Sequence, residues 1–372
     1  MKNIKNLVVG CGLAGIVIAN KIANELKEPV LIIDSKDHIG GTCYDYKDDV
    51  TGITVHKYGP HIFRTNSTEI WDYLSQYTKW RPFMHHVLGV IDGIAVPIPF
   101  NLDSLHKVFP ESMATKMEQK LVEKFGYNKK VPILELRKTT DEDLVFLADY
   151  IYNKVFLGYT LKQWGFTPEQ LDPSVTASVP VFIGRDSRYF QEKYQGIPFN
   201  GYTKMFENML NNPLIEVQLN TSFEQIKKAV QYERLFYTGA IEDFFDFKYG
   251  KLPYRSLNIK IETYNEERFQ AAPVVNYPEN YDFTRIAEYK YFLNETSDKT
   301  VLSFEYPEEF ISGKNDRIYP ILNTENQEIY NRYKADADKL HNVYFLGRLG
   351  AYRYYDMNRT IANALELFNK IK

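Results

Sequence analysis

The chain has 372 residues, 44% of them hydrophobic, so it can bury a substantial core and is expected to form two or three lobes. Its formal net charge of −3 gives no overall electrostatic reason to bind nucleic acid or an anionic membrane surface. Two cysteines are too few for a disulfide framework, no metal-ligand spacing occurs, and no apolar run approaches the ~20 residues of a membrane span. We therefore expect a cytoplasmic protein with no metal site and no integral membrane segment.

The most organised segment is the N-terminal one. Two short apolar strands, 7–9 and 30–33, flank a stretch with helical spacing, and the second strand ends in Asp34. The turn after the first strand carries a G-x-G-x-x-G pattern, made by Gly10, Gly12 and Gly15. Such glycines allow close approach of the backbone to a pyrophosphate, and Asp34 can accept a hydrogen bond from a ribose hydroxyl. The segment predicts a dinucleotide-binding fold; a glycine-rich turn that binds nothing is the alternative.

A second glycine pair, Gly40 and Gly41, follows Asp34 and favours FAD over NAD. This extension resembles flavoproteins of the glutathione-reductase-like superfamily. The next stretch, VHKYGPHIFR (55–64), places Tyr58 and His61 around a stiff Gly-Pro turn. The alternative for that stretch is an ordinary turn whose histidine forms its hydrogen bonds within the fold.

Helical signals dominate 102–172, with Thr140 as an expected N-cap, and short strands of alternating pattern follow the Pro- and Gly-rich stretch 175–200. The predicted fold class is α/β: a FAD-binding Rossmann-like domain with an inserted helical bundle and an antiparallel β-sheet domain. The expected boundaries are 1–80, 200–250 and 320–372 for the discontinuous FAD domain; 102–172 for the bundle, with a mobile substrate loop near 164–180; and 81–101, 181–199 and 251–319 for the sheet domain.

Residues 347–359, GRLGAYRYYDMNR, form a glycine-marked turn before a helical pattern. The turn crowds arginines and tyrosines where backbone N–H groups of a helix N-terminus are exposed. Guanidinium forks and phenol donors suit phosphate oxygens, so a flat anionic ligand is expected here. A packed aromatic turn is the alternative.

Four segments, YGPHIF, GYTLKQWG (158–165), TRIAEYKYF (284–292) and GRLGAYRYYDMN, occur in the order typical of one family. Over essentially its full length the chain resembles bacterial UDP-galactopyranose mutases. The resemblance implies FAD, active when reduced, whose N5 attacks the anomeric carbon while UDP-galactopyranose and UDP-galactofuranose interconvert. It also implies a UDP-sugar substrate, a role in cell-surface polysaccharide biosynthesis and a homodimer.

The resemblance assigns roles to individual residues. The predicted catalytic residues are His61, Arg64, Arg285, Tyr354 and Asp356. The predicted substrate-binding residues are Phe156, Tyr159, Trp164, Arg185, Tyr189, Asn276 and Tyr319. The predicted cofactor-binding residues are Gly10, Gly12, Gly15, Asp34, Gly40, Gly41, Tyr58 and Arg348. No side chain needs to act as nucleophile, which fits the absence of an evident triad or carboxylate pair.

Some positions depart from the family pattern. Arg64 stands where a histidine is usual, and His85 where an asparagine is usual. The arginine of the mobile loop aligns with Ser178, and Arg185 or Arg188 could restore its charge. Because an arginine offers several donors to an acetamido carbonyl, we expect UDP-N-acetylgalactosamine to be accepted as well.

Two other functions start from the same FAD fingerprint. One is a FAD-dependent oxidoreductase of the amine-oxidase-like superfamily, and the other is a flavin-bearing binding protein without catalysis. The fold alone does not separate them from a mutase.

Overall fold

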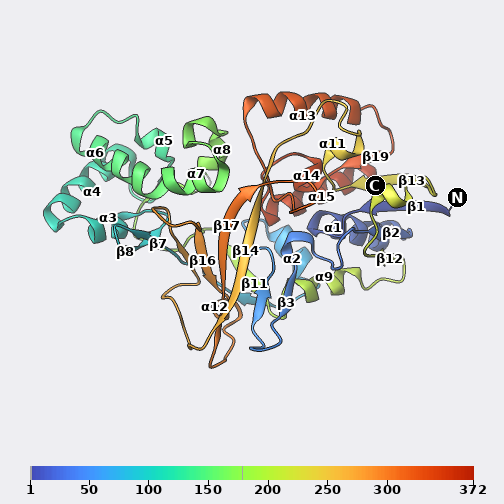
Figure 1. The fold of residues 1–372 in the computed structure, drawn as a ribbon, viewed down its shortest axis with the longest axis horizontal. Helices are drawn as coiled ribbons and strands as arrows, with labels where there is room; N and C mark the ends of the chain where they lie inside the picture. The colour runs from blue at the N-terminus through green and yellow to red at the C-terminus, as the bar shows by residue number, and fades with distance from the viewer. Residues whose placement is uncertain (1, 178) are drawn as a thin grey trace.

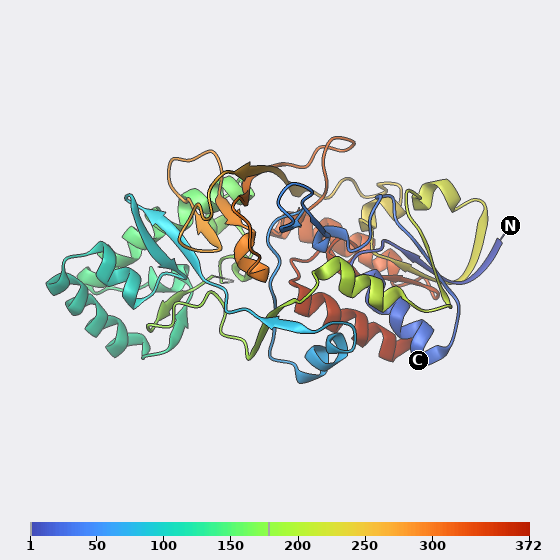
Figure 2. The same cartoon turned by 90° about the horizontal axis from the view of Figure 1, so that it is seen from below.

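The structure is a computed structural model that describes residues 2–177 and 179–372. Figure 1 shows three parts in a row: a lobe that carries both chain termini, a central sheet and a helical lobe. Figure 2, from below, separates the helical lobe and the terminal lobe to opposite ends of the molecule. None of the helices among the described residues is long and apolar enough to cross a membrane.

The terminal lobe is built on a five-stranded parallel sheet. The strand order is β12 (Ile215–Gln218), β2 (Val30–Ile33), β1 (Lys2–Val9), β13 (Val230–Tyr237) and β19 (Val343–Phe345). Helices α1 (Leu13–Lys21), α9 (Tyr202–Leu210) and α15 (Met357–Ile371) pack together in the core on one face. A separate cluster with α10 (Phe223–Ile226) and α11 (Ile241–Phe244) covers the other face. Burial on both faces explains why these strands are continuously apolar.

Smaller elements complete this lobe. They are η1 (Ile22–Leu26), η2 (Gly41–Cys43), β3 (Asp45–Lys47) paired with β4 (Thr54–His56), α2 (Thr68–Ser75), α13 (Thr324–Ala337) and α14 (Gly347–Gly350). The predicted Rossmann-like fold is confirmed, because the first strand, the glycine turn and α1 follow one another as in the sequence pattern.

The central sheet has seven strands. Their order is β18 (Tyr319–Pro320), β14 (Tyr254–Tyr264), β17 (Thr300–Glu309), β16 (Arg285–Glu288), β15 (Val274–Asn276), β7 (Val87–Ile91) and β8 (Ile94–Ile98), with α12 (Lys290–Leu293) after β16. The pair β15–β7 is parallel, so the predicted antiparallel sheet is in fact mixed. No hairpin joins these two strands, which lie far apart in the sequence, so nothing local imposes an antiparallel pairing.

The segment 181–199 differs from its expected place. Its first strand, β10 (Val181–Ile183), pairs with β9 (Lys129–Val131). Its second, β11 (Tyr194–Pro198), lies between β5 (Phe63–Thr65) and β6 (Trp80–Pro82). Neither joins the seven-stranded sheet, because these strands are too short and too interrupted for an alternating pattern to specify their partners.

The helical lobe contains α3 (Leu102–Val108), α4 (Glu111–Phe125), α5 (Ile133–Leu136), α6 (Glu142–Ile151), the π-helical turn η3 (Tyr152–Leu157), α7 (Gly158–Trp164), η4 (Pro168–Gln170) and α8 (Pro173–Thr176). The expected N-cap Thr140 is wrong by one residue. Asp141 caps α6, and its carboxylate accepts hydrogen bonds from the N–H groups of Asp143 and Leu144. A carboxylate at this end also interacts favourably with the helix dipole.

Candidate active site

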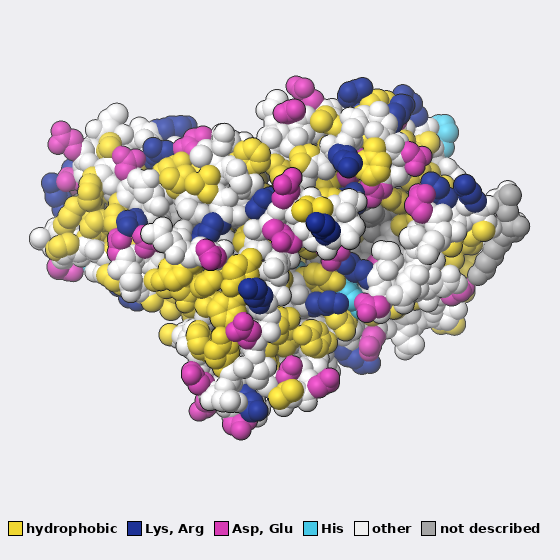
Figure 3. All heavy atoms as spheres, in the orientation of Figure 1, with side chains coloured by type: hydrophobic (Ala, Val, Ile, Leu, Met, Phe, Trp, Pro, Cys, Tyr) yellow, Lys and Arg dark blue, Asp and Glu magenta, His cyan; other side chains and the backbone are white. Residues whose placement is uncertain are grey.

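A cavity of about 950 Å³ runs from the parallel sheet to the central sheet. Residues from the glycine turn, the GPHIF turn, β16 and the GRLGAYRYYDMNR turn all line it. On the face shown in Figure 3, arginine or lysine side chains and a histidine gather between the hydrophobic surface of the central sheet and the terminal lobe. Segments that are distant in the sequence therefore meet in one cavity.

The glycine turn at one end of the cavity has no room for side chains. Gly10 has a φ of +101°, and a Cβ built on it would lie 1.9 Å from Thr238 Oγ1. A Cβ on Gly15 would lie 2.0 Å from the Gly10 carbonyl oxygen. A Cβ on Gly41 would lie 3.0 Å from Gly12 Cα, so the second glycine pair packs against the first turn. The bare backbone and the N-terminus of α1 form a cradle suited to a pyrophosphate.

Asp34 stands at the end of β2 and lines the same cavity. Its two carboxylate oxygens accept hydrogen bonds from the backbone N–H groups of Cys11 (2.7 Å) and Lys36 (2.9 Å). A carboxylate can accept about four hydrogen bonds, so Asp34 keeps capacity for a ribose hydroxyl. The backbone bonds fix its orientation in advance.

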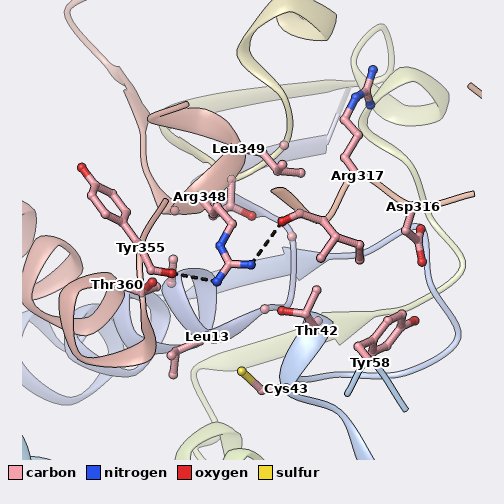
Figure 4. A pocket seen from close by; sticks show the side chains of 18 of the residues that line it. Leu13, Thr42, Cys43, Tyr58, Asp316, Arg317, Arg348, Leu349, Tyr355 and Thr360 are labelled. Atoms are coloured by element: carbon pink, nitrogen blue, oxygen red, sulfur yellow. Dashed lines mark hydrogen bonds between the residues drawn. The ribbon is translucent and has the colours of Figure 1, made fainter. Parts of the chain in front are cut away.

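Arg348 lies deeper in the cavity, as Figure 4 shows. Its guanidinium group donates to the carbonyl oxygens of Tyr355 (2.7 Å) and Ile318 (3.1 Å). These bonds tie α14 to the turn before α15 and to the segment before β18. Tyr58 lies across the cavity, where its hydroxyl is 2.9 Å from His38 Nε2. The cradle, the ribose acceptor and this cation together fit an FAD molecule.

At the other end, Arg285 forms a buried ion pair. Its Nε lies 2.7 Å from Oε2 of Glu305, whose side chain is only 1% exposed. Burial disfavours the charge on Arg285, but the Glu305 carboxylate outweighs this effect and raises its pKa well above the usual value. Arg285 therefore stays charged, and it lines the cavity.

Tyrosines surround this cation. Tyr189 and Tyr319 line the cavity, and burial raises the pKa of each to about 12. Burial also raises the pKa of Tyr159. All three phenols keep their protons at neutral pH, so they offer hydroxyl donors around Arg285.

The histidines at this end are neutral. Burial lowers the pKa of His61 and of His85 to about 3, and nearby Arg285 adds to the effect in both. Nδ1 of His61 lies 2.8 Å from the Gly59 carbonyl oxygen, which can only accept, so Nδ1 carries the proton. His61 is thus left with an acceptor at Nε2. Nδ1 of His85 is buried without a hydrogen-bond partner among the described residues.

Arg64 and Asp356 form an ion pair beside the cavity. Nη1 of Arg64 lies 2.5 Å from Glu192 Oε1, Nη2 lies 3.3 Å from Asp356 Oδ2, and the guanidinium group stacks on Phe190 at 4.0 Å. Asp356 is also the N-cap of α15, where its Oδ1 accepts from the Arg359 N–H. Arg64 is therefore held by two carboxylates and an aromatic ring.

Trp164, Tyr319 and Tyr354 form an aromatic cluster, with Trp164 5.7 Å and 5.8 Å from the two tyrosine rings. Phe156 is buried in the core, and Asn276 lies opposite Arg285 in the β15–β16 pair. Of the predicted substrate-binding residues, Tyr189 and Tyr319 line the cavity, whereas Phe156, Tyr159, Trp164, Arg185 and Asn276 are not part of its lining.

Arg185, predicted to bind the substrate and, with Arg188, a candidate to replace the loop arginine, does not line the cavity. Arg185 pairs with Asp103 (2.8 Å) and Glu118 (2.7 Å) on the helical lobe. Arg188 is also engaged, by Asp186 at 2.6 Å. Carboxylates on α3 and α4 bind the Arg185 guanidinium group, and a carboxylate two residues away in the same loop binds that of Arg188. Ser178, the position of the departure, lies outside the described residues.

Glu305 and Thr238 were not predicted as site residues. Glu305 is a carboxylate at a buried position of β17, and a Cβ on Gly59 would lie 2.7 Å from its Oε1. Thr238 follows β13 and donates through Oγ1 to the Val9 carbonyl oxygen (2.8 Å). A glutamate within the apolar run VLSFEYP was the one available signal for Glu305.

Comparison with known proteins identifies the family. A family model for UDP-galactopyranose mutase matches residues 154–354, and one for an NAD(P)-binding Rossmann-like domain matches residues 8–77. A probable UDP-galactopyranose mutase from Klebsiella pneumoniae is 36% identical over 369 residues, which cover 98% of this chain and 94% of that protein. The chain belongs to the UDP-galactopyranose mutase family. It is accordingly an isomerase with FAD as its cofactor.

The mutase family includes relatives with other substrates. A dTDP-fucopyranose mutase from Escherichia coli is 33% identical over 368 residues, with 97% of each chain covered. The crystal structure of a reduced UDP-galactopyranose mutase matches with a TM-score of 0.74 at 14% identity and covers 100% of this chain and 94% of that one. A putative protoporphyrinogen oxidase matches with a TM-score of 0.68 at 12% identity, over 100% and 99% of the two chains. These structural matches show a shared fold, so it is the family assignment that separates this mutase from oxidoreductases.

Proposed function

We propose that the protein interconverts UDP-galactopyranose and UDP-galactofuranose, and also UDP-N-acetylgalactopyranose and its furanose form. The observation that carries this proposal is the charged Arg285, held by buried Glu305 among protonated tyrosines, in the same cavity as the glycine cradle. A diphosphate between a flavin and a sugar would meet a fixed cation and phenol donors there. Cytoplasmic location, the homodimer and the polysaccharide pathway remain predictions.

The reaction breaks the bond between C1 of the sugar and the UDP oxygen, and later forms it again. Reduced FAD, held by the glycine cradle, Asp34 and Arg348, would supply the nucleophile that takes the place of UDP at C1 and leaves again when UDP returns. Arg285 neutralises the charge that develops on the departing diphosphate, and the hydroxyls of Tyr189 and Tyr319 donate to its oxygens. The leaving group stays in the cavity and can return to C1 after the ring has reclosed through the 4-hydroxyl.

His61 and the Arg64–Asp356 pair have separate roles in this proposal. Neutral His61 accepts a hydrogen bond from a sugar hydroxyl through Nε2, because its other nitrogen is engaged by Gly59. Arg64 holds Asp356 at the N-terminus of α15 and keeps further N–H donors for a substituent at C2 of the sugar. An acetamido carbonyl can accept from such a donor.

The test is a comparison of substrates. The reduced enzyme is incubated anaerobically with UDP-galactose, UDP-N-acetylgalactosamine or dTDP-fucose, and the furanose products are separated by chromatography. The proposal expects furanose from both UDP-sugars, and it expects Arg64→His to weaken the acetamido substrate selectively. If only UDP-galactose were turned over, the proposed activity on UDP-N-acetylgalactosamine would be wrong. Turnover of the dTDP-sugar alone would show that the uridine assignment is wrong.

A further inference from the structure

Lys162, on α7, has an unusual set of partners. Its Nζ lies 3.1 Å from each of the backbone carbonyl oxygens of Glu279, Tyr281 and Phe283 and also contacts that of Tyr277, so its three N–H groups are shared among four acceptors. These four residues alternate along the loop 277–283, which connects β15 to β16. The loop is closed at its base, where the Tyr277 N–H donates to the Thr284 carbonyl oxygen (2.8 Å).

Four carbonyl groups that converge on one point form a site for a monovalent cation. Rings of backbone carbonyls bind potassium in channels because they replace its hydration shell, and an ammonium ion is similar in size. Here the cation is tethered to the protein through a lysine side chain. The charged form brings three N–H donors to these carbonyls and the neutral form two. Burial lowers the pKa of Lys162 to about 8, and Asp282 opposes that shift. Lys162 is thus charged at neutral pH.

The same side of the η3–α7 helix touches the loop at two further points. Lys154 Nζ pairs with Glu279 Oε1 at 2.7 Å and with Asp92 Oδ1 at 2.5 Å. A Cβ on Gly158 would lie 2.3 Å from the Pro278 carbonyl oxygen, so the helix and the loop approach closely there. Lys154, Gly158 and Lys162 are spaced by four residues, which places them along one side of a helix.

The central sheet also binds the end of α7. Arg255 on β14 donates through Nε to the Gln163 carbonyl oxygen (2.9 Å) and through Nη2 to the Lys162 carbonyl oxygen (3.0 Å). Carbonyl groups at a helix C-terminus lack intrahelical partners, and an arginine satisfies them. The helix that carries Tyr159 and Trp164 is therefore held to the central sheet in two ways. The Lys162 side chain contacts the loop 277–283, and Arg255 binds the carbonyl groups at the end of the helix.

The loop 277–283 sits between two predicted site residues. Asn276 ends β15, and Arg285 begins β16 directly after Thr284. Tyr159, one turn before Lys162, is close enough to Arg285 that each affects the pKa of the other. Any shift of the loop would therefore move Arg285 relative to Tyr159.

We propose that Lys162 is a positioning residue whose ammonium group is a built-in monovalent cation. It shapes the carbonyl ring of 277–283, keeps Arg285 next to Tyr159, and so holds Arg285 at the diphosphate. The diphosphate part of this inference rests on the proposed function. The ring of carbonyl groups around Lys162 does not depend on which substrate binds. An emptied ring should bind a free cation of the size of ammonium or potassium.

The experiment uses the FAD-loaded full chain with Lys162→Ala, and Lys138→Ala as the control, since Lys138 is exposed and pairs with Glu135 at the surface. Anaerobic mutase kinetics are measured with ammonium, potassium, sodium or tetramethylammonium chloride at constant ionic strength. In tetramethylammonium, kcat/KM of Lys162→Ala should fall at least about tenfold, mainly through KM, because charged hydrogen bonds at the loop are lost. Ammonium or potassium should restore it several-fold and saturably, without effect on the control.

A second readout does not depend on catalysis. Ammonium or potassium should raise the Tm of Lys162→Ala but not of the wild type, whose ring is filled. Lys162→Met, which keeps the apolar stem, should lose activity without responding to cations. Unchanged kcat/KM in Lys162→Met, or a loss in Lys162→Ala that no cation reverses in activity or Tm, would overturn the proposal. Absence of mutase activity in the wild type together with a cation-dependent Tm of the variant would instead overturn the proposed function and support the ring.

Discussion

Replacement of Arg285 by methionine should impair both turnover and stability, for separable reasons. Turnover falls because the fixed cation at the diphosphate is lost, which is worth about 2–3 kcal/mol, or roughly 30- to 160-fold in kcat/KM. Stability falls because the Glu305 carboxylate, 1% exposed, keeps its burial but loses its partner at 2.7 Å. Removal of one member of a buried ion pair typically costs about 3–5 kcal/mol.

The double variant Arg285→Met/Glu305→Gln separates the two effects, because the neutral amide removes the unpaired charge. Urea unfolding should show that the double variant regains most of the lost free energy of unfolding. Anaerobic turnover with UDP-galactose should remain as low as in Arg285→Met. If turnover recovered together with stability, Arg285 would serve the fold and not the diphosphate, and the reasoning would be refuted.

Three further outcomes are expected. Gly10→Ala should abolish FAD retention, measured by visible absorbance of the purified protein, because its Cβ would lie 1.9 Å from Thr238 Oγ1; a variant that kept its flavin would contradict the cradle. Burial raises the pKa of Glu242 to about 7 from the ordinary 4.5, so the folded state binds more protons and its stability should fall by up to about 3 kcal/mol as pH rises from 5 to 8. Glu242→Gln should remove this dependence in urea unfolding, and an unchanged slope would count against it. Arg185→Ala should leave turnover within about twofold of the wild type, since Asp103 and Glu118 engage its charge at the surface; a large loss would revive its predicted role at the substrate.

The parts of the fold that the sequence predicted are those with dense local signals. The glycine turn, the apolar strands beside it and Asp34 form one contiguous unit, so spacing alone specified them. The partners of β10 and β11 could not be predicted, because each pairing joins short strands from distant segments. The same holds for the parallel pair β15–β7.

The residues of the candidate site also differ in how far the sequence could predict them. Several of the predicted cations and tyrosines line the cavity, and they could be singled out because they occur in recognisable segments. Glu305 and the carbonyl ring around Lys162 were not found, since the first depends on which strand neighbours β16 and the second uses backbone atoms that no residue type reveals. The ion pairs of Arg185 depend on the packing of α3 and α4 against the segment after β10, which is likewise a tertiary property.

We expect reduced FAD and the Arg285 site together to isomerise a nucleotide sugar without net redox change. The most direct measurement counts furanose product per equivalent of reductant when the dithionite-reduced enzyme, freed of excess dithionite, is mixed anaerobically with UDP-galactose. We expect many furanose molecules per flavin, with the flavin still reduced at the end and no product from the oxidised enzyme. Stoichiometric oxidation of the flavin or of the sugar, or equal turnover by the oxidised enzyme, would contradict it.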